Sequence, residues 1–146
     1  MAIDLKQLVE ADLIDHEGFS GSVYNDHLGF ATIGIGRLVD ERRGGGISLD
    51  EARYLLRNDI MWRLHSLREK LPWFDNAPEN TKRALLNMCF QLGIKGLLKF
   101  KRTLKLIENG DYRAAADEAL RSNWARQTPG RAEEVAGWIR NSKPNA

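Results

Sequence analysis

The spacing of apolar positions changes twice along the chain and divides it into three parts. Over residues 4–15, Leu5, Leu8 and Leu13 recur near the spacing of an amphipathic helix, which Gly18 can end. From 19 to 38, short extended runs alternate with glycines and with the turn-forming segment "NDHLG". This second pattern predicts a small antiparallel sheet with tight turns. After Ser48 the spacing is helical again.

A capping box opens the second helical part. Ser48 can cap the helix, and Glu51 follows three residues later. Apolar residues then recur at threes and fours up to Leu71, and Pro72 ends the pattern. We predict one long amphipathic helix over about 48–71.

Everything beyond this helix is predicted to be helical. An apolar stripe over residues 84–92 ends at Gly93, and Gly110 is placed to end another helix. Thr128 and Pro129 are placed as the cap and the first residue of the last helix.

The three patterns together predict an α+β fold in one domain over residues 1–146. We expect a small antiparallel β lobe at about 16–46. A larger all-helical lobe at about 73–140 also takes in the N-terminal helix, and the long helix connects the two lobes. The chain is long enough for such a domain to bury a real core.

Charge is spread unevenly over an ordinary globular composition. Hydrophobic residues make up 42% of the chain and charged residues 29%, with a net charge of +2. The formal charge is −4 over residues 1–75 and +6 over residues 76–146. A basic C-terminal half can meet nucleic acid or an anionic polymer such as a bacterial envelope, or it can be a solvated surface without a partner.

A single cysteine, Cys89, rules out an internal disulfide and fits folding in a reducing compartment. It lies in an apolar helical stripe, which favours a buried small hydrophobe over a nucleophile. Helical spacing also assigns the four tryptophans to the core: Trp62, Trp73, Trp124 and Trp138.

No pattern indicates a cofactor, a metal ion or a membrane span. The sequence has no phosphate-binding loop, no dinucleotide fingerprint and no paired Cys/His spacing. The N-terminus lacks a basic segment followed by an apolar one, and no apolar run approaches the ~20 residues that span a bilayer. We therefore expect a protein made in the cytoplasm, with no stable membrane insertion, no cofactor and no metal.

Candidate chemistry gathers in residues 16–37, "HEGFSGSVYNDHLGFATIGIGR". Glu17 lies at the end of the first predicted helix, Asp26 lies in a turn, and Thr32 follows in the predicted strand. Two carboxyl groups and a hydroxyl are the parts needed to hydrolyse a glycosidic bond, if the hairpin folds back against the helix end. The alternative is that Glu17 and Asp26 are ordinary surface residues.

Two glycines share one face of the predicted strand "FATIGIG" with Thr32. Ile33 and Ile35 point to the other face, because strand side chains alternate. Glycine is disfavoured in strands, so a purpose is expected. We interpret Gly34 and Gly36 as a bare wall that a bulky ligand can approach closely.

The motif "EG…Y-x-D…G…TIGIG" resembles that of the phage lysozymes of glycoside hydrolase family 24, closely those of the T-even bacteriophage type. The resemblance covers nearly the whole chain. It extends, in order and at compatible spacing, to "DEARYLLRNDI", "LLNMCFQLGIKGLLKF" and "AAADEALRSNWARQTPGRAEEV".

The resemblance implies a lysozyme-like fold, with a cleft between the lobes, and a mechanism. Glu17 would be the general acid, and Asp26 and Thr32 would position a water on the opposite face of the sugar. Attack by water predicts inversion, which requires carboxyl groups ~6.5–9.5 Å apart. The implied substrate is the β-1,4 bond between N-acetylmuramic acid and N-acetylglucosamine in peptidoglycan. The implied setting is host cell lysis by an endolysin that reaches the wall from the host cytoplasm.

Other positions of the family's pattern are matched by Leu38, Phe90, Thr103 and Glu118, which the resemblance makes substrate contacts. Core packing is the alternative for Phe90. Glu118 stands where family members often have an amide, and an ionised carboxylate cannot donate a hydrogen bond. Arg131 matches an arginine near the catalytic glutamate.

One departure from the family's pattern is Arg37, which stands where histidine is common. We predict that Arg37 pairs with Asp59 on the long helix. Because arginine does not titrate in the working range, this pair should not switch off near neutral pH.

Three alternatives remain beside hydrolysis. A lytic transglycosylase needs one catalytic glutamate, so the presence of Asp26 and Thr32 argues for hydrolysis. An inactive wall-binding module should have lost one of the three catalytic residues. Nucleic-acid binding by the basic half has no recognition motif to support it. We expect peptidoglycan as the partner, no nucleic acid, and a monomer.

Overall fold

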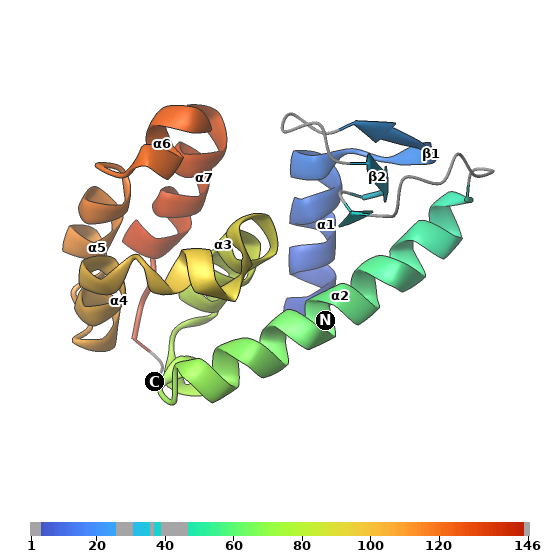
Figure 1. The fold of residues 1–146 in the computed structure, drawn as a ribbon. Helices are drawn as coiled ribbons and strands as arrows, with labels where there is room; N and C mark the ends of the chain where they lie inside the picture. The colour runs from blue at the N-terminus through green and yellow to red at the C-terminus, as the bar shows by residue number, and fades with distance from the viewer. Residues whose placement is uncertain (1–3, 26–30, 36, 39–46, 145–146) are drawn as a thin grey trace. The chain divides into compact units, whose positions relative to one another are not determined.

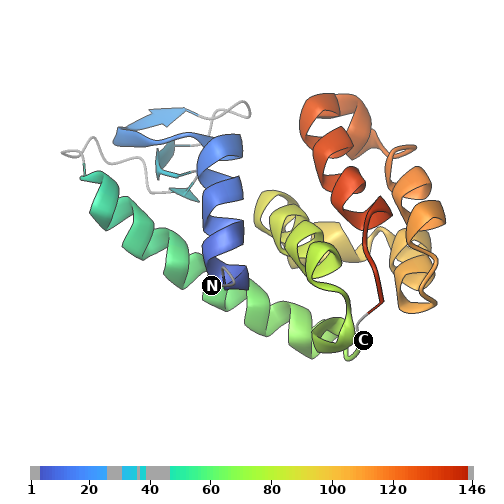
Figure 2. The ribbon, with the colours of Figure 1, turned by 180° about the vertical axis from the view of Figure 1, so that it is seen from behind.

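The computed structural model of the chain describes residues 4–25, 31–35, 37–38 and 47–144, with the backbone alone for 21–25, 31, 33, 37 and 38. The chain divides into an N-terminal unit, Met1–Met61, and a helical unit, Trp62–Ala146. The boundary falls within helix α2 (Leu49–Lys70). Figures 1 and 2 show the elements of both units from opposite sides, and each unit is described by itself.

Helix α1 (Leu5–Glu17) opens the N-terminal unit with a capping box. The Asp4 carboxylate accepts from the Lys6 amide at 2.8 Å, and the Gln7 side chain accepts from the Asp4 amide at 3.3 Å. The helix ends at Gly18, whose φ of 73° no other residue type adopts readily. The prediction that Gly18 ends this helix is confirmed.

Among the described residues after α1, three short strands form an antiparallel sheet in the order β1-β2-β3. Strand β1 is Ser20–Asn25, β2 is Ala31–Gly34 and β3 is Arg37–Leu38. Figure 1 shows the strands in blue and teal beside α1.

The predicted fold class needs correction, because the strands do not make up a β lobe. They contribute 6, 4 and 2 residues, whereas α1 alone contributes 13. Helix α1 belongs to the same unit as the strands and not to the helical unit. The physical reason is burial: a sheet this small hides little apolar surface by itself. The apolar stripe of α1, with Val9 and Leu13 fully buried, supplies the missing core.

Helix α2 begins with the predicted capping box. The Glu51 amide donates to the Ser48 hydroxyl at 3.1 Å, and the Ser48 amide donates to the Glu51 carboxylate at 3.3 Å. The predicted apolar stripe of this helix is buried at Ala52, Leu56, Ile60, Leu64 and Leu67. The predicted long helix is therefore confirmed, and it ends at Lys70, two residues before Pro72.

As far as residue 144, the helical unit consists of the end of α2 and six further helical elements. These are η1 (Phe74–Asn76), α3 (Glu79–Leu98), α4 (Lys101–Glu108), α5 (Tyr112–Ala119), α6 (Asn123–Gln127) and α7 (Pro129–Arg140). Helix α7 contacts α3, α5 and α6 and buries Ala132, Val135, Ala136 and Ile139 completely. In Figure 2 the red α7 runs beside the yellow-green α3 and the orange α5.

Glycine and proline mark most of the predicted helix boundaries in this unit. Gly93 interrupts α3 with a φ of 75°, Gly110 follows α4 with a φ of 81°, and Pro129 is the first residue of α7. Thr128 stands at the N-cap position of α7, but its side chain makes no capping hydrogen bond. The short helix α6 was not predicted.

The prediction that all four tryptophans pack in the core is wrong for Trp62. Its side chain lies on the outer face of α2 and is 68% exposed. Trp124 is buried, and its indole N–H donates to Gln91 at 2.8 Å. Trp138 is half-buried, with the Arg83 guanidinium 3.9 Å from its ring centroid. Among the residues that the structure describes, no helix is both long and apolar enough to cross a bilayer.

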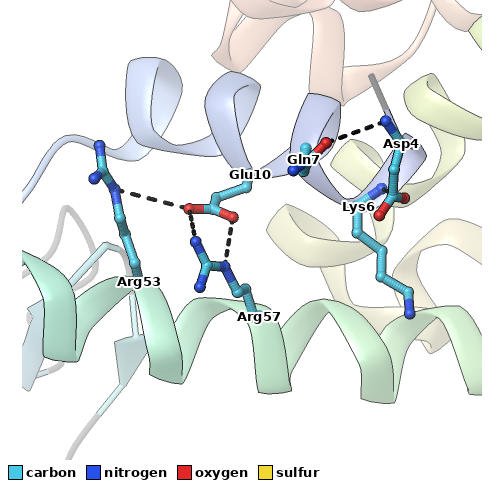
Figure 3. A network of polar contacts seen from close by, with 6 residues as sticks. All are labelled: Asp4, Lys6, Gln7, Glu10, Arg53 and Arg57. Carbon is cyan, nitrogen blue, oxygen red and sulfur yellow. Dashed lines mark hydrogen bonds and ion pairs between the residues drawn. The ribbon is translucent and has the colours of Figure 1, made fainter. Parts of the chain in front are cut away.

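A buried carboxylate links α1 to α2 within the N-terminal unit (Figure 3). Glu10 is 8% exposed, and its carboxylate accepts from the Arg57 Nε at 2.9 Å and lies 3.8 Å from the Arg53 Nε. The hydrogen bond to Glu10 raises the pKa of Arg57 above its ordinary value. A carboxylate at this depth is costly without such partners.

We expect Arg57→Gln to lower the thermal midpoint of the chain, because it leaves the Glu10 carboxylate buried with one partner fewer. The matched control is Arg68→Gln, which breaks a 2.8 Å pair with Asp75 in which both side chains are more than half exposed. That substitution should leave the midpoint nearly unchanged. Equal effects of both variants, measured by circular dichroism, would contradict the role given to Glu10.

The predicted burial of Cys89 is confirmed, since this residue of α3 has no exposed surface. Burial raises the pKa of the Cys89 thiol to about 11, with Arg63 opposing the shift. The thiolate that reacts with alkylating agents is therefore scarce in the folded state at neutral pH.

Iodoacetamide should label Cys89 very slowly in the folded chain at pH 8 and quickly in urea. Because the folded state holds the thiol protonated, stability should also fall as pH rises from the ordinary thiol pKa toward 11. Mass spectrometry of timed samples follows the labelling. Rapid labelling of the folded protein would show that the thiol is accessible.

Candidate functional site

The structure describes two of the three predicted catalytic residues, and both lie in the N-terminal unit. Glu17 is the last residue of α1 and is half-buried. Thr32 lies in the middle strand, β2, and is 3% exposed. Asp26 lies outside the described residues.

The strand register brings β2 back beside the segment that follows Glu17. Ser20, three residues after Glu17, pairs with Gly34, and Tyr24 pairs with Thr32. Thr32 is two residues from Gly34 along β2, which is about 7 Å in an extended strand. On the other edge of β2, Thr32 pairs with Leu38. The hairpin therefore folds back toward the end of α1, as the hydrolytic arrangement requires.

Several predicted positions of this region lie outside what is described. Gly36 is not among the described residues, and Leu38 is described by its backbone alone. The predicted ion pair between Arg37 and Asp59 rests on the Arg37 side chain, which is also outside the described part. The roles of these residues stay predictions.

The interpretation of Gly34 as a bare wall facing a ligand is wrong. Gly34 is buried, and a Cβ added there would lie 3.4 Å from the Ala52 Cβ and 3.5 Å from the Ile47 Cδ1. Residues around the start of α2 therefore cover this face. The backbone gives the actual reason for glycine, because a φ of +71° disfavours any side chain.

The helical unit holds a pocket of about 470 Å³. It lies where the end of α3, the start of α4, the end of α5 and helix α6 meet. Two predicted substrate contacts line it: Thr103, which is 2% exposed, and Glu118, which is half-buried. The sequence places these two residues on different helices, and the fold brings both to one pocket.

Glu118 is held between two arginines at this pocket. Its Oε2 atom lies 3.5 Å from the Arg121 Nη1 and 3.9 Å from the Arg102 Nε. Both arginines line the pocket as well, as do Lys99 and Lys101. The Glu118 carboxylate therefore faces two guanidinium groups here. An ionised carboxylate accepts hydrogen bonds but cannot donate one, as an amide at this position could.

Phe90 and Arg131 lie elsewhere in the helical unit. Phe90 is half-buried in α3, with the Arg63 guanidinium 5.1 Å from its ring centroid. Arg131 is in the first turn of α7, and its Nε donates to the buried Asn87 side chain at 3.0 Å. The predicted place of Arg131 near Glu17 relates two units and stays a prediction.

Sequence reasoning missed the apolar and basic residues of the pocket. Phe100 and Trp124 meet edge to face there, with ring centroids 5.9 Å apart. The signal that could have indicated them is the run "LKFKR" at 98–102, in which three cations surround one aromatic residue just before a helix. Trp124 was assigned to the core alone, because helical spacing cannot distinguish a core position from a pocket wall.

Comparisons with known proteins cover the whole chain. The model of the family described as phage lysozyme matches residues 14–143. "Probable T4-type lysozyme 1" of Dictyostelium discoideum is 30% identical over 100% of this chain and 99% of that protein. "Probable T4-type lysozyme 2" of the same organism is 30% identical over 92% of each chain. "Pre-baseplate central spike protein Gp5" of Enterobacteria phage T4 is 31% identical over 82% of this chain and 25% of that protein.

Gly34→Ala should lower the free energy of unfolding by about 1–2 kcal/mol, because alanine is strained at a positive φ. The same substitution at Gly137, inside α7 with open space around it, should raise that free energy by up to about 1 kcal/mol. Urea unfolding followed by far-UV circular dichroism compares the two. A Gly34→Ala variant as stable as the wild type would contradict the conformational reason for this glycine.

Proposed function

This chain belongs to the phage lysozyme family, and from that premise we propose that it is a peptidoglycan hydrolase. It cleaves the β-1,4 bond between N-acetylmuramic acid and N-acetylglucosamine. The observation that carries the proposal is the antiparallel register: Ser20, three residues after Glu17, pairs with Gly34, which lies two residues from Thr32 along β2. The family match includes both residues and Asp26.

Glu17 acts as the general acid. Its place at the end of α1, half-buried, supports this role, because the carboxyl group is held by a helix and still reaches solvent. It donates its proton to the glycosidic oxygen as the bond to the anomeric carbon breaks. The leaving sugar then departs as a neutral alcohol.

Asp26 and Thr32 hold the attacking water on the opposite face of the sugar. Asp26 accepts a proton from this water as its oxygen forms the new bond to the anomeric carbon. The low exposure of Thr32 supports its role, because a hydroxyl shielded from bulk solvent can hold a single ordered water in place. Direct attack by water inverts the configuration of the anomeric carbon.

The remaining predicted contacts bind the substrate. Leu38 and Phe90 contact sugar, and Thr103 contributes a hydroxyl from the pocket wall. We propose host cell lysis as the biological setting. The protein acts as a monomer on the wall after release from the cytoplasm, and its basic C-terminal half favours the anionic envelope.

Glu17→Gln should reduce the clearing of a peptidoglycan suspension by about a hundredfold or more, because glutamine cannot give up a proton to the leaving oxygen. Far-UV circular dichroism should show the wild-type fold. The matched control is Asp15→Asn, which neutralises an exposed carboxylate two residues earlier in α1 and should keep full activity.

Full activity of Glu17→Gln would remove Glu17 as the acid. A wild-type chain that binds peptidoglycan without clearing it would instead identify a wall-binding module. Either result would contradict the proposed function, and neither result depends on the pocket of the helical unit.

A further inference from the structure

Helix α1 carries a buried carboxylate, Glu10, and the proposed general acid, Glu17, on the same side. The two residues are seven positions apart in the helix, which is about 20° short of two full turns. They are separated by about 10.5 Å along the helix axis. The Gly18 amide closes the last turn by donating to the Ile14 carbonyl at 2.9 Å. A rotation or a shift of α1 at Glu10 therefore also moves Glu17.

Arg57 of α2 holds the Glu10 carboxylate with two N–H groups, as Figure 3 shows. Its Nε donates to the Glu10 Oε2 at 2.9 Å, and its Nη2 donates to the Glu10 Oε1 at 3.4 Å. Paired bonds of this kind fix the orientation of a carboxylate as well as its distance. Because Glu10 is buried, this contact fixes the position of α1 against α2.

Arg53 approaches the same carboxylate without a hydrogen bond. Its Nε lies 3.8 Å from the Glu10 Oε1 and has no hydrogen-bond partner within the part of the chain that the structure describes. A lysine at position 53 keeps this attraction between charges. A lysine at position 57 keeps the charge but loses the paired bonds, because an ammonium group lacks the planar fork of a guanidinium group. The two arginines therefore allow charge to be separated from orientation.

The same stretch of α2 also packs against the strand that carries Thr32. Ala52, the residue before Arg53, is 2% exposed, and its Cβ would lie 3.4 Å from a Cβ added at Gly34. Gly34 is two residues from Thr32 along β2. Helix α2 therefore contacts the acid-bearing helix through Glu10 and the Thr32 strand through Ala52.

We propose that Glu10 and Arg57 are positioning residues, which set the place of the Glu17 carboxyl group relative to Thr32. The proposal rests on the proposed function, since that function gives Glu17 and Thr32 their roles. A general acid must lie within hydrogen-bond reach of the leaving oxygen, so a small displacement of α1 slows the bond-breaking step. The binding of the glycan depends on other residues and is not altered.

The first test is Arg57→Lys, with Arg68→Lys as the matched control on the same helix. Each substitution removes an Nε hydrogen bond to a carboxylate, 2.9 Å long at Arg57 and 2.8 Å long at Arg68. The partner of Arg68 is Asp75, and both of these side chains are more than half exposed.

Arg57→Lys should lower the kcat for soluble peptidoglycan fragments about tenfold and leave KM within about twofold of the wild type. Arg68→Lys should change neither constant. The assay is run at a temperature at which circular dichroism shows every variant to be folded. A loss of folded protein alone would lower the activity of Arg57→Lys without this dependence on an intact, folded sample.

Two further variants separate orientation from charge. Arg53→Lys should lower kcat less than Arg57→Lys does, because it removes no hydrogen bond. Glu10→Asp withdraws the carboxylate by one methylene group and should lower kcat as Arg57→Lys does. The double variant with Glu10→Asp and Arg57→Lys should be no slower than the slower single variant, because both changes break the same contact.

Amide resonances give a readout that does not depend on catalysis. Arg57→Lys should shift the backbone amide signals of Glu17 and Gly18, and Arg68→Lys should leave them in place. A wild-type kcat in Arg57→Lys, or effects that multiply in the double variant, would overturn the positioning role while the hydrolase stands. A wild-type chain that cleaves no peptidoglycan would overturn the hydrolase, and the amide shifts would then support the link from Arg57 to Glu17 by themselves.

Discussion

The helical unit depends on the burial of one face of α7. Four residues of this helix, Ala132, Val135, Ala136 and Ile139, have no exposed surface. Burying the valine and the isoleucine alone stabilises a fold by about 1.5–3 kcal/mol each. Because α3, α5 and α6 all pack against α7, this face fixes three of the elements that meet at the pocket. The N-terminal unit has a polar counterpart in Glu10, whose buried carboxylate fixes the approach of α2 to α1.

Local signals in the sequence predicted where helices begin and end. They did not predict how helices and strands are divided between the two units. Capping residues act within one turn, so Ser48, Glu51, Gly18 and Pro129 could be assigned from sequence alone. The unit to which α1 belongs could not be predicted, because the capping residues and spacing of a helix do not indicate what the helix packs against. The interpretation of Gly34 was wrong for a similar reason: period-two spacing suggested an open face, whereas Gly34 has a positive φ and a Cβ added there would lie 3.4 Å from the Ala52 Cβ.

One part of the candidate site could be predicted from the family's motif, and the other part could not. Glu17, Asp26 and Thr32 could be named from their spacing and the resemblance, and the strand register supports bringing the hairpin back to α1. The pocket could not be predicted in full, because its walls come from helices that are distant in sequence. Arg102, Glu118 and Arg121 illustrate this. Glu118 and Arg121 are three residues apart in the chain, whereas Arg102 belongs to α4. Their charge pattern is a property of the tertiary structure.

Water as the nucleophile is the central claim, and the configuration of the first product tests it most directly. Proton NMR during the first minutes of digestion, before mutarotation is complete, resolves the anomeric proton of the newly formed N-acetylmuramic acid end. Attack by water that Asp26 and Thr32 position opposite Glu17 predicts the α-anomer as the first product. A β-anomer would indicate a covalent intermediate with retention, and a 1,6-anhydro ring would indicate a transglycosylase; either product would contradict the account.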